Sequence, residues 1–98
     1  MSSDDRQAAQ RRVTDLITLV RSLPQHDHLG RLINEADALG RAIAAFHLEG
    51  IRFRMYNVDR LVSHSPVSLP SDAATAVSDI RHHLEAAGFH TRSHQAPG

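Results

Sequence analysis

The feature that most constrains the fold is a long stretch without proline, which lies between Pro24 and Pro66. Within it, residues 29–62 hold more than half of the bulky apolar side chains of the chain. Apolar residues recur there every three or four positions, which is the spacing of an amphipathic helix. Proline tends to end a helix, because the residue before it avoids the helical region. The chain should therefore be organised around one long helical segment with shorter elements on either side.

Two shorter amphipathic segments flank this stretch. Helical spacing relates Leu16 to Val20 in the first segment and Ile80 to Leu84 in the second. Gly88 follows the second segment, and glycine is common where a helix ends. The sequence therefore predicts an all-α fold with three antiparallel helices, of which the central one is long. The helices are expected near residues 6–23, 28–63 and 71–87.

Gly50 marks a change within the long segment. The apolar stripe of Ile51, Met55 and Val58 is rotated by about a quarter turn from the stripe that precedes the glycine. One straight helix cannot bury both stripes against one partner, so the helix either bends at Gly50, contacts two partners or ends there. We favour a helix that continues to about Ser63 and can kink at Gly50. Residues 51–56 also alternate between apolar and polar side chains, which is typical of a strand. An α+β fold with a short strand at 51–56 is the alternative.

The length of 98 residues suits one domain, so residues 1–98 are predicted to form a single helical domain. Its two ends, 1–5 and 89–98, are expected to be flexible, although Phe89 could fold back as the contact that often accompanies a glycine cap. The chain has three Phe, one Tyr and no Trp, so its core should be modest. Self-association would bury more apolar surface and is a reasonable expectation for so small a core.

Charge and composition exclude several classes of partner. The net charge is zero with neutral histidine, so no basic field attracts nucleic acid or an anionic membrane. Cysteine is absent, which removes disulfides, thiolate catalysis and cysteine-based zinc sites. No apolar run reaches the length of a membrane span, and the polar N-terminus lacks the apolar core of a secretory signal. We expect a cytoplasmic protein that does not bind membranes, and nucleic-acid binding through Arg52, Arg54 and Arg60 is the third and weakest hypothesis.

Motifs for catalysis and for cofactors are absent from the sequence. Gly30, Gly40 and Gly50 are isolated and do not form a glycine-rich phosphate loop. No glutamate is followed by a histidine three residues later, as the di-iron carboxylate bundles require. The chain is therefore predicted not to be an enzyme and to need no cofactor.

Eight histidines are the most unusual feature of the composition. Protonation of all eight would take the net charge from 0 to +8. His47, expected to be buried at the edge of the main apolar stripe, would matter most to such a pH response, but we favour the interpretation that it is a hydrogen-bonded histidine at a helix packing edge. Neutral imidazole is also a common metal ligand. In a three-helix antiparallel arrangement, the loop at 25–28 would lie near the end of the third helix. A metal-binding or metal-sensing protein is thus the second hypothesis, with candidate ligands His26, His28, His83 and His90.

The first hypothesis for function is self-association through the segment that follows Gly50. Phe53 lies opposite the stripe of Ile51, Met55 and Val58, so a helix that buries this stripe would expose Phe53. A large exposed apolar side chain flanked by arginine is typical of interfaces. We therefore predict a non-enzymatic interaction or regulatory module that forms a homo-oligomer, most simply a homodimer, or binds a protein partner. Its anchors would be Phe53, Met55, Tyr56 and Leu61, with Arg52, Arg54 and Arg60 at the rim.

Overall fold

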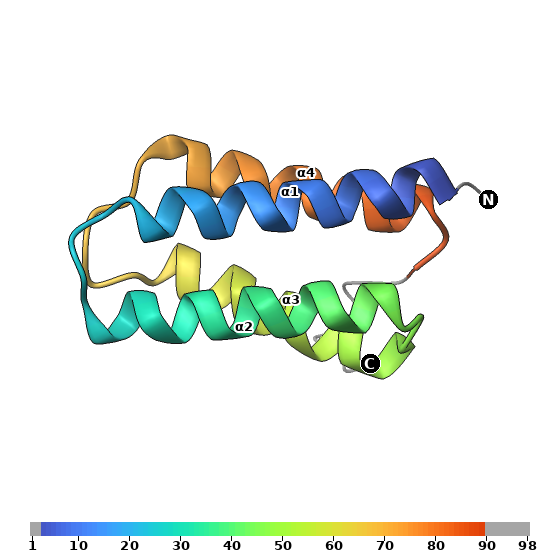
Figure 1. Ribbon diagram of the computed structural model, residues 1–98, viewed down its shortest axis with the longest axis horizontal. Coiled ribbons are helices and arrows are strands. Elements are labelled where there is room, and N and C mark those ends of the chain that lie inside the picture. Colours follow the sequence, from blue (N-terminus) through green and yellow to red (C-terminus); the bar gives the residue numbers. More distant parts are fainter. Residues whose placement is uncertain (1–2, 90–98) are drawn as a thin grey trace.

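The structure is a computed structural model that describes residues 3–89. In this range the chain forms four α-helices and no strand, so the prediction of three helices is wrong. Each helix runs antiparallel to the one before it, and the connections lie at alternate ends of the bundle (Figure 1). The helices are α1 (Ser3–Arg21), α2 (Asp27–Ala44), α3 (Leu48–Ser63) and α4 (Ser71–Ala86).

The long central helix predicted over 28–63 is in fact two helices, and the break lies before Gly50. The residue after the C-cap of α2 is Phe46, whose backbone has a φ of 56° in the left-handed region. Its N–H donates to the carbonyl of Ile43, and the N–H of His47 donates to the carbonyl of Ala42. These two bonds form a Schellman motif, which ends α2 and reverses the chain direction. Gly50 lies inside the first turn of α3, so it is not the residue at which the two helices separate.

The same motif ends α4, where the sequence did indicate it. Gly88 has a φ of 98°, its N–H donates to the carbonyl of Glu85, and the N–H of Phe89 donates to the carbonyl of Leu84. Phe89 is buried, so its expected return onto the helix is confirmed. The ends of α2 and α4 have the same hydrogen-bond pattern. Phe46 therefore occupies the position at which this motif usually has a glycine.

The alternative of a strand at 51–56 is also wrong. These residues lie in the middle of α3. Ile51, Met55 and Val58 are completely buried and form the helical stripe that faces the core. The arginines between them, Arg52 and Arg54, are partly buried at its edges. The apparent alternation therefore reflects a buried helical stripe of Ile51 and Met55 with an exposed Phe53 between them in sequence, rather than one face of a strand.

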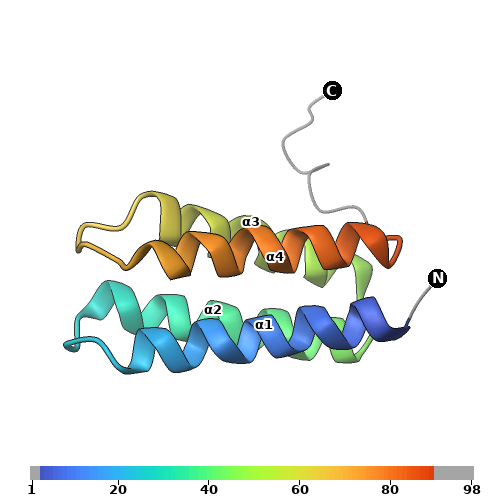
Figure 2. The same cartoon turned by 90° about the horizontal axis from the view of Figure 1, so that it is seen from above.

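All four helices contribute to one hydrophobic core. The views in Figures 1 and 2 together place them at the corners of a square, with α1 beside both α2 and α4. Contact is most extensive between α1 and α4 and between α2 and α3, and least extensive between α3 and α4. Gly40 on α2 faces α1, where an added Cβ would lie 3.5 Å from Val13. The core includes the fully buried side chains Leu16, Leu32, Leu39, Ile43, Ile80 and Leu84.

Two helices begin with a histidine cap. Nδ1 of His26 accepts a hydrogen bond from the backbone N–H of His28 at the start of α2. Nδ1 of His47 accepts from the backbone N–H of Gly50 at the start of α3. Each bond satisfies one of the amide groups that the first turn of a helix leaves without a partner. No helix within residues 3–89 has both the length and the apolar character needed to cross a membrane.

Candidate functional site

Exposed apolar side chains are concentrated in one short part of the chain. Among the residues whose placement the structure gives, the large hydrophobic side chains that are exposed are Phe46 (59%), Leu48 (57%) and Phe53 (46%). All three belong to the α2–α3 connection and the first half of α3. Single exposed apolar residues are ordinary on protein surfaces, but a group of them indicates a site of interaction.

Phe46 does not share a surface with Phe53. The Phe46 ring lies against the other two helices of the bundle. The guanidinium of Arg6 on α1 lies 4.3 Å from its centroid, and the ring of Phe89 after α4 lies 6.3 Å away. Phe46 therefore closes the end of the bundle, which explains why a strained backbone position holds a bulky residue.

Phe53 borders an open groove between α2 and α3, which we call the Phe53 groove. Its volume is about 580 Å³. Three small residues from the two helices, Ala38, Ala42 and Gly50, leave the space beside the Phe53 ring. The groove therefore places a projecting aromatic side chain next to a recess. The lining residues are Ala38, Arg41, Ala42, His47, Glu49, Gly50, Phe53 and Arg54.

The charged side chains of the Phe53 groove are each paired within the chain. Arg54 donates to both carboxylate oxygens of Glu35 at 3.0 Å, and its guanidinium lies 5.0 Å from the Phe53 centroid. Arg41 pairs with Asp37 at 2.6 Å. The third pair joins Glu49 to Arg52 at 3.1 Å. Such surface pairs add little to stability. Their effect here is that the groove carries no net charge.

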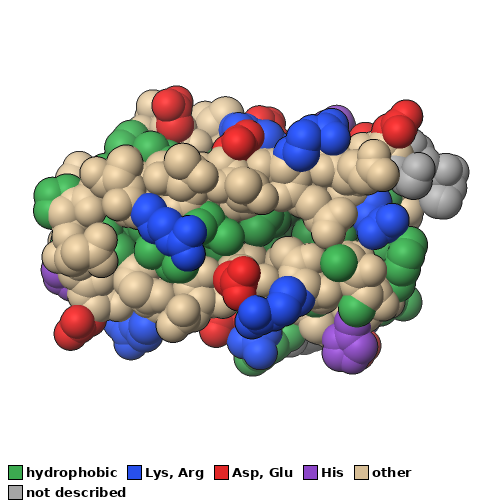
Figure 3. Space-filling model, viewed as in Figure 1, with side chains coloured by type: hydrophobic (Ala, Val, Ile, Leu, Met, Phe, Trp, Pro, Cys, Tyr) green, Lys and Arg blue, Asp and Glu red, His purple; other side chains and the backbone are tan. Residues whose placement is uncertain are grey.

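Positive, negative and hydrophobic side chains are interspersed on the face of the molecule shown in Figure 3. Side chains of both signs alternate along the lower edge of this view. Hydrophobic side chains come to the surface along the seam between α1 and α2 and at the end that carries the α2–α3 turn. The face has no field of one sign that would steer a highly charged partner.

The structure brings only some of the predicted interface residues together. Phe53 and Arg54 line the groove, and Arg52 holds its carboxylate, Glu49. Met55 is completely buried in the core and cannot act as a surface anchor. It belongs to the stripe that α3 turns towards the other helices.

The remaining predicted interface residues lie elsewhere on α3. Tyr56 and Leu61 are partly buried, and Arg60 is exposed. Arg60 donates to the hydroxyl of Tyr56 at 3.2 Å, and its guanidinium lies 5.7 Å from the ring centroid. None of the three lines the Phe53 groove. His47, by contrast, lines the Phe53 groove although it was not among the predicted interface residues.

The candidate metal ligands are distributed over both ends of the bundle. His26 and His28 lie at the start of α2, where His26 caps the helix and His28 is buried. Nδ1 of His83 lies 3.1 Å from a carboxylate oxygen of Asp5, at the end where α1 begins and α4 finishes. In a three-helix bundle the last helix would end near the loop at 25–28, but in this four-helix bundle it ends at the opposite end. The structure therefore does not bring His83 to His26 and His28.

His90 lies outside the described residues. Between residues 3 and 89, no three His, Asp or Glu side chains are grouped so that they could hold a metal ion. The geometric reason for the metal hypothesis, which was that the loop at 25–28 and the end of the last helix meet, is therefore absent from the fold.

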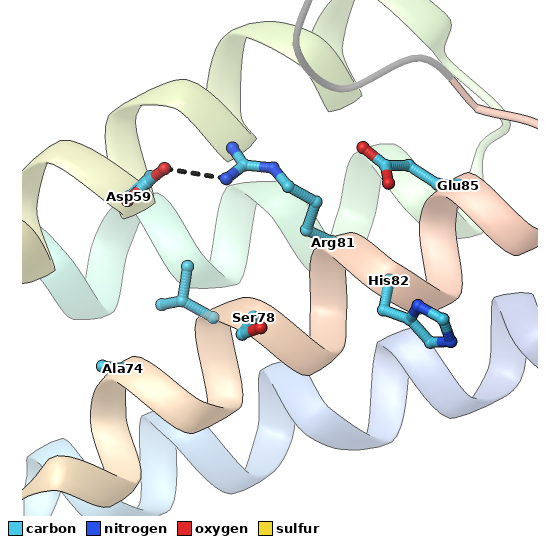
Figure 4. Close-up of a pocket in the computed structure, with 7 residues that line it drawn as sticks. Asp59, Ala74, Ser78, Arg81, His82 and Glu85 are labelled. Atoms are coloured by element: carbon cyan, nitrogen blue, oxygen red, sulfur yellow. Dashed lines mark hydrogen bonds and ion pairs between the residues drawn. The ribbon is translucent and has the colours of Figure 1, made fainter.

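A second cavity, of about 320 Å³, lies along α3 and α4 and is mainly polar (Figure 4). The Arg81 side chain reaches from α4 to Asp59 on α3, with a nitrogen–oxygen distance of 2.8 Å. Glu85 points towards α3, whereas the His82 ring points away from it. The ion pair bridges α3 and α4, which have the least contact of the neighbouring helix pairs. We therefore assign this cavity to helix packing.

Arg12 holds α1 to α4. It binds Asp15 on its own helix at 2.9 Å and Asp79 on α4 at 3.1 Å. The hydrogen bond to Asp15 is the largest of the effects that raise the pKa of Arg12, and the negative charges of Asp79 and Asp15 add to it. This cluster is structural, because both carboxylates are engaged by the guanidinium.

Comparison of the chain with protein-family models, with curated proteins and with solved structures found no match. The features of the molecule that bear on function are the four-helix bundle and the Phe53 groove on its α2–α3 face.

Proposed function

We propose that the protein is a non-enzymatic interaction module that forms a homodimer through the Phe53 groove. One observation carries the proposal. The half-exposed Phe53 ring stands beside a recess with a floor of small residues, and every charged side chain around it is already paired. Burying this surface would gain hydrophobic free energy without leaving an arginine or a carboxylate stranded.

A second copy of the chain is the partner that fits this surface. A dimer with twofold symmetry needs one patch that is complementary to itself, so a projection and a recess must lie side by side. Phe53 and the space beside Ala38 and Ala42 meet this condition. A strongly charged partner would find no opposite charge to pair with in the groove. A second copy presents the same neutral surface, and its net charge is also zero.

The dimer should be weak. A typical stable interface buries about 800 Å² on each partner, and the accessible surface of the whole chain is 5587 Å². The Phe53 groove is only part of such an area, so the exposed residues of α2 and α3 around it would have to join the contact. We therefore expect a dissociation constant on the order of 1 μM or weaker, at the weak end of the range for interfaces of this size.

Substitution of Phe53 tests this proposal. In sedimentation equilibrium, Phe53→Ala should weaken self-association by about tenfold or more, because a central aromatic anchor is often worth at least 2 kcal/mol. Helix content measured by circular dichroism should remain unchanged, because the ring is not part of the core. The matched control is Phe46→Gly, which removes another exposed phenylalanine whose backbone suits glycine. If both variants weaken association equally, or neither does, the Phe53 groove is not the interface.

A further inference from the structure

His47 is placed so that its protonation state decides how α3 begins. Its Nδ1 atom accepts a hydrogen bond from the backbone N–H of Gly50, with a distance of 3.1 Å. An imidazole nitrogen can accept only while it carries no proton. The cap that starts α3 therefore requires His47 with an unprotonated Nδ1.

Gly50 allows the imidazole to take this position. A Cβ atom at residue 50 would lie 2.4 Å from Nδ1 of His47, which is closer than such atoms can approach. The ring thus lies directly over the first turn of α3, where only a glycine leaves room for it. Both residues line the Phe53 groove, so the position of the ring shapes the groove as well as the helix.

His47 is exposed rather than buried, and the charged side chains around it are already paired with one another. Arg41 of α2 and Arg54 of α3 line the same groove, and they pair with Asp37 and Glu35. Glu49 is the only carboxylate among the lining residues, and it pairs with Arg52. The N-terminal end of α3 adds the positive end of a helix dipole. A protonated His47 would therefore lose its hydrogen bond and add positive charge to a groove that is otherwise neutral.

We propose that His47 makes self-association dependent on pH, with the dimer favoured at neutral pH and weakened in mild acid. This inference rests on the proposed dimer. Above the range in which histidine titrates, the ring caps α3 and forms one wall of the groove. Below it, the ring leaves the Gly50 amide and the first turn of α3 loosens. In a twofold dimer the effect counts twice, because each copy brings its own His47 to the interface.

The test is the dissociation constant of the full chain at about pH 7.5 and about pH 5.5, which bracket the titration of histidine. The wild type should bind about tenfold more weakly at the lower pH, because two caps worth a few-fold each are lost. His47→Asn should respond much less, since asparagine caps a helix without titrating. His26→Asn is the matched control, because it replaces the same kind of cap at the start of α2, and it should respond as the wild type does. An equal response in His47→Asn and the wild type would overturn the proposal.

A second variant reproduces the effect of acid at neutral pH. Gly50→Ala should displace the imidazole and weaken association at about pH 7.5. Alanine favours a helix more than glycine does, which opposes any loosening of α3, and circular dichroism should show unchanged helix content. Undiminished association of Gly50→Ala would contradict the role of the ring in the groove.

The amide of Gly50 reports on the His47 cap even in the monomer, so the cap can be tested separately from the dimer. In nuclear magnetic resonance spectra of dilute protein, the Gly50 amide shift should follow the titration of an imidazole in the wild type and should not do so in His47→Asn. A chain that stays monomeric at every pH would overturn the proposed dimer. A Gly50 amide that ignores pH would overturn the His47 switch even if the dimer forms.

Discussion

The imidazole of His28 lies 2.7 Å from the backbone carbonyl oxygen of Leu61 and joins the start of α2 to the end of α3. A carbonyl oxygen can only accept a hydrogen bond, so Nε2 of His28 carries the proton. His28 is the buried polar residue of the core, with 6% of its surface exposed. The contact fastens α3 to α2 at the end of the bundle opposite the α2–α3 turn.

Removal of this bond should lower the stability of the bundle. His28→Ala deletes a buried hydrogen bond and leaves space in the core, which should reduce the free energy of unfolding by about 2 kcal/mol. Urea unfolding followed by circular dichroism would measure the change. His64→Ala is the control, because His64 is exposed at the end of α3, and its effect should stay within about 0.5 kcal/mol. A loss of similar size in both variants would mean that the His28 bond contributes little.

Substitution of Met55 should lower the free energy of unfolding strongly, whereas substitution of Phe53 should hardly change it. Met55→Ala leaves a cavity at a completely buried position and should reduce the free energy of unfolding by about 2–5 kcal/mol. Phe53→Ala should change this free energy by less than about 1 kcal/mol, since the ring is half exposed. Urea unfolding at a concentration low enough to keep the chain monomeric separates the two effects. If Phe53→Ala proved as destabilising as Met55→Ala, Phe53 would be a core residue and not an interface anchor.

The left-handed backbone of Phe46 predicts an unusual order of stabilities. Phe46→Ala and Phe46→Gly both lose the contacts with Arg6 and Phe89. Only the glycine variant also loses the steric penalty of a side chain at a φ of 56°. Phe46→Gly should therefore be more stable than Phe46→Ala by about 1 kcal/mol, as thermal or urea unfolding can show. The reverse order, in which the alanine variant is the more stable one, would show that residue 46 has no such strain.

The cluster of Arg12 with Asp15 and Asp79 should make a small contribution to the free energy of unfolding that does not change with pH near neutrality. The raised pKa of Arg12 means that the stability it contributes is complete below the ordinary pKa of arginine and is lost only in strong alkali. Between about pH 6 and pH 9 the effect of Arg12→Gln should therefore be constant, at about 0.5 kcal/mol, and should shrink in high salt. Urea unfolding at several pH values measures this. An Arg12→Gln effect that disappears within that range would contradict the assignment.

The sequence predicts the ends of these helices well where glycine marks them and poorly where it does not. Gly88 and Phe46 occupy equivalent positions in two Schellman motifs, with φ values of 98° and 56°. The first was visible as a cap, and the second was hidden in an apolar residue that also fits a helical stripe. The strain at Phe46 is balanced by contacts with Arg6 and Phe89, which are far away in the sequence. No local pattern could reveal them.

That one hidden turn also explains why the candidate sites were predicted only in part. The exposure of Phe53 followed from the phase of the α3 stripe and could be predicted, whereas the groove beside it could not. Its wall of Ala38 and Ala42 exists because α2 ends and α3 folds back against it. The turn also adds a helix, which sends the end of α4 away from His26 and His28. The cap that His47 forms at the start of α3 had no sequence signal, because the residues that usually mark a helix start are Ser, Thr, Asp and Asn.

The mass of the protein in solution tests the proposed dimer most directly. Light scattering on chelator-treated wild-type protein, over concentrations from about 1 μM to about 1 mM, covers the expected dissociation constant. Self-association through the Phe53 groove predicts a mass that rises with concentration from the 10.8 kDa of one chain towards twice that value. The rise should occur without any metal and should be absent from Phe53→Ala over the lower part of the range. A mass that stays at 10.8 kDa across the whole range would contradict the homodimer.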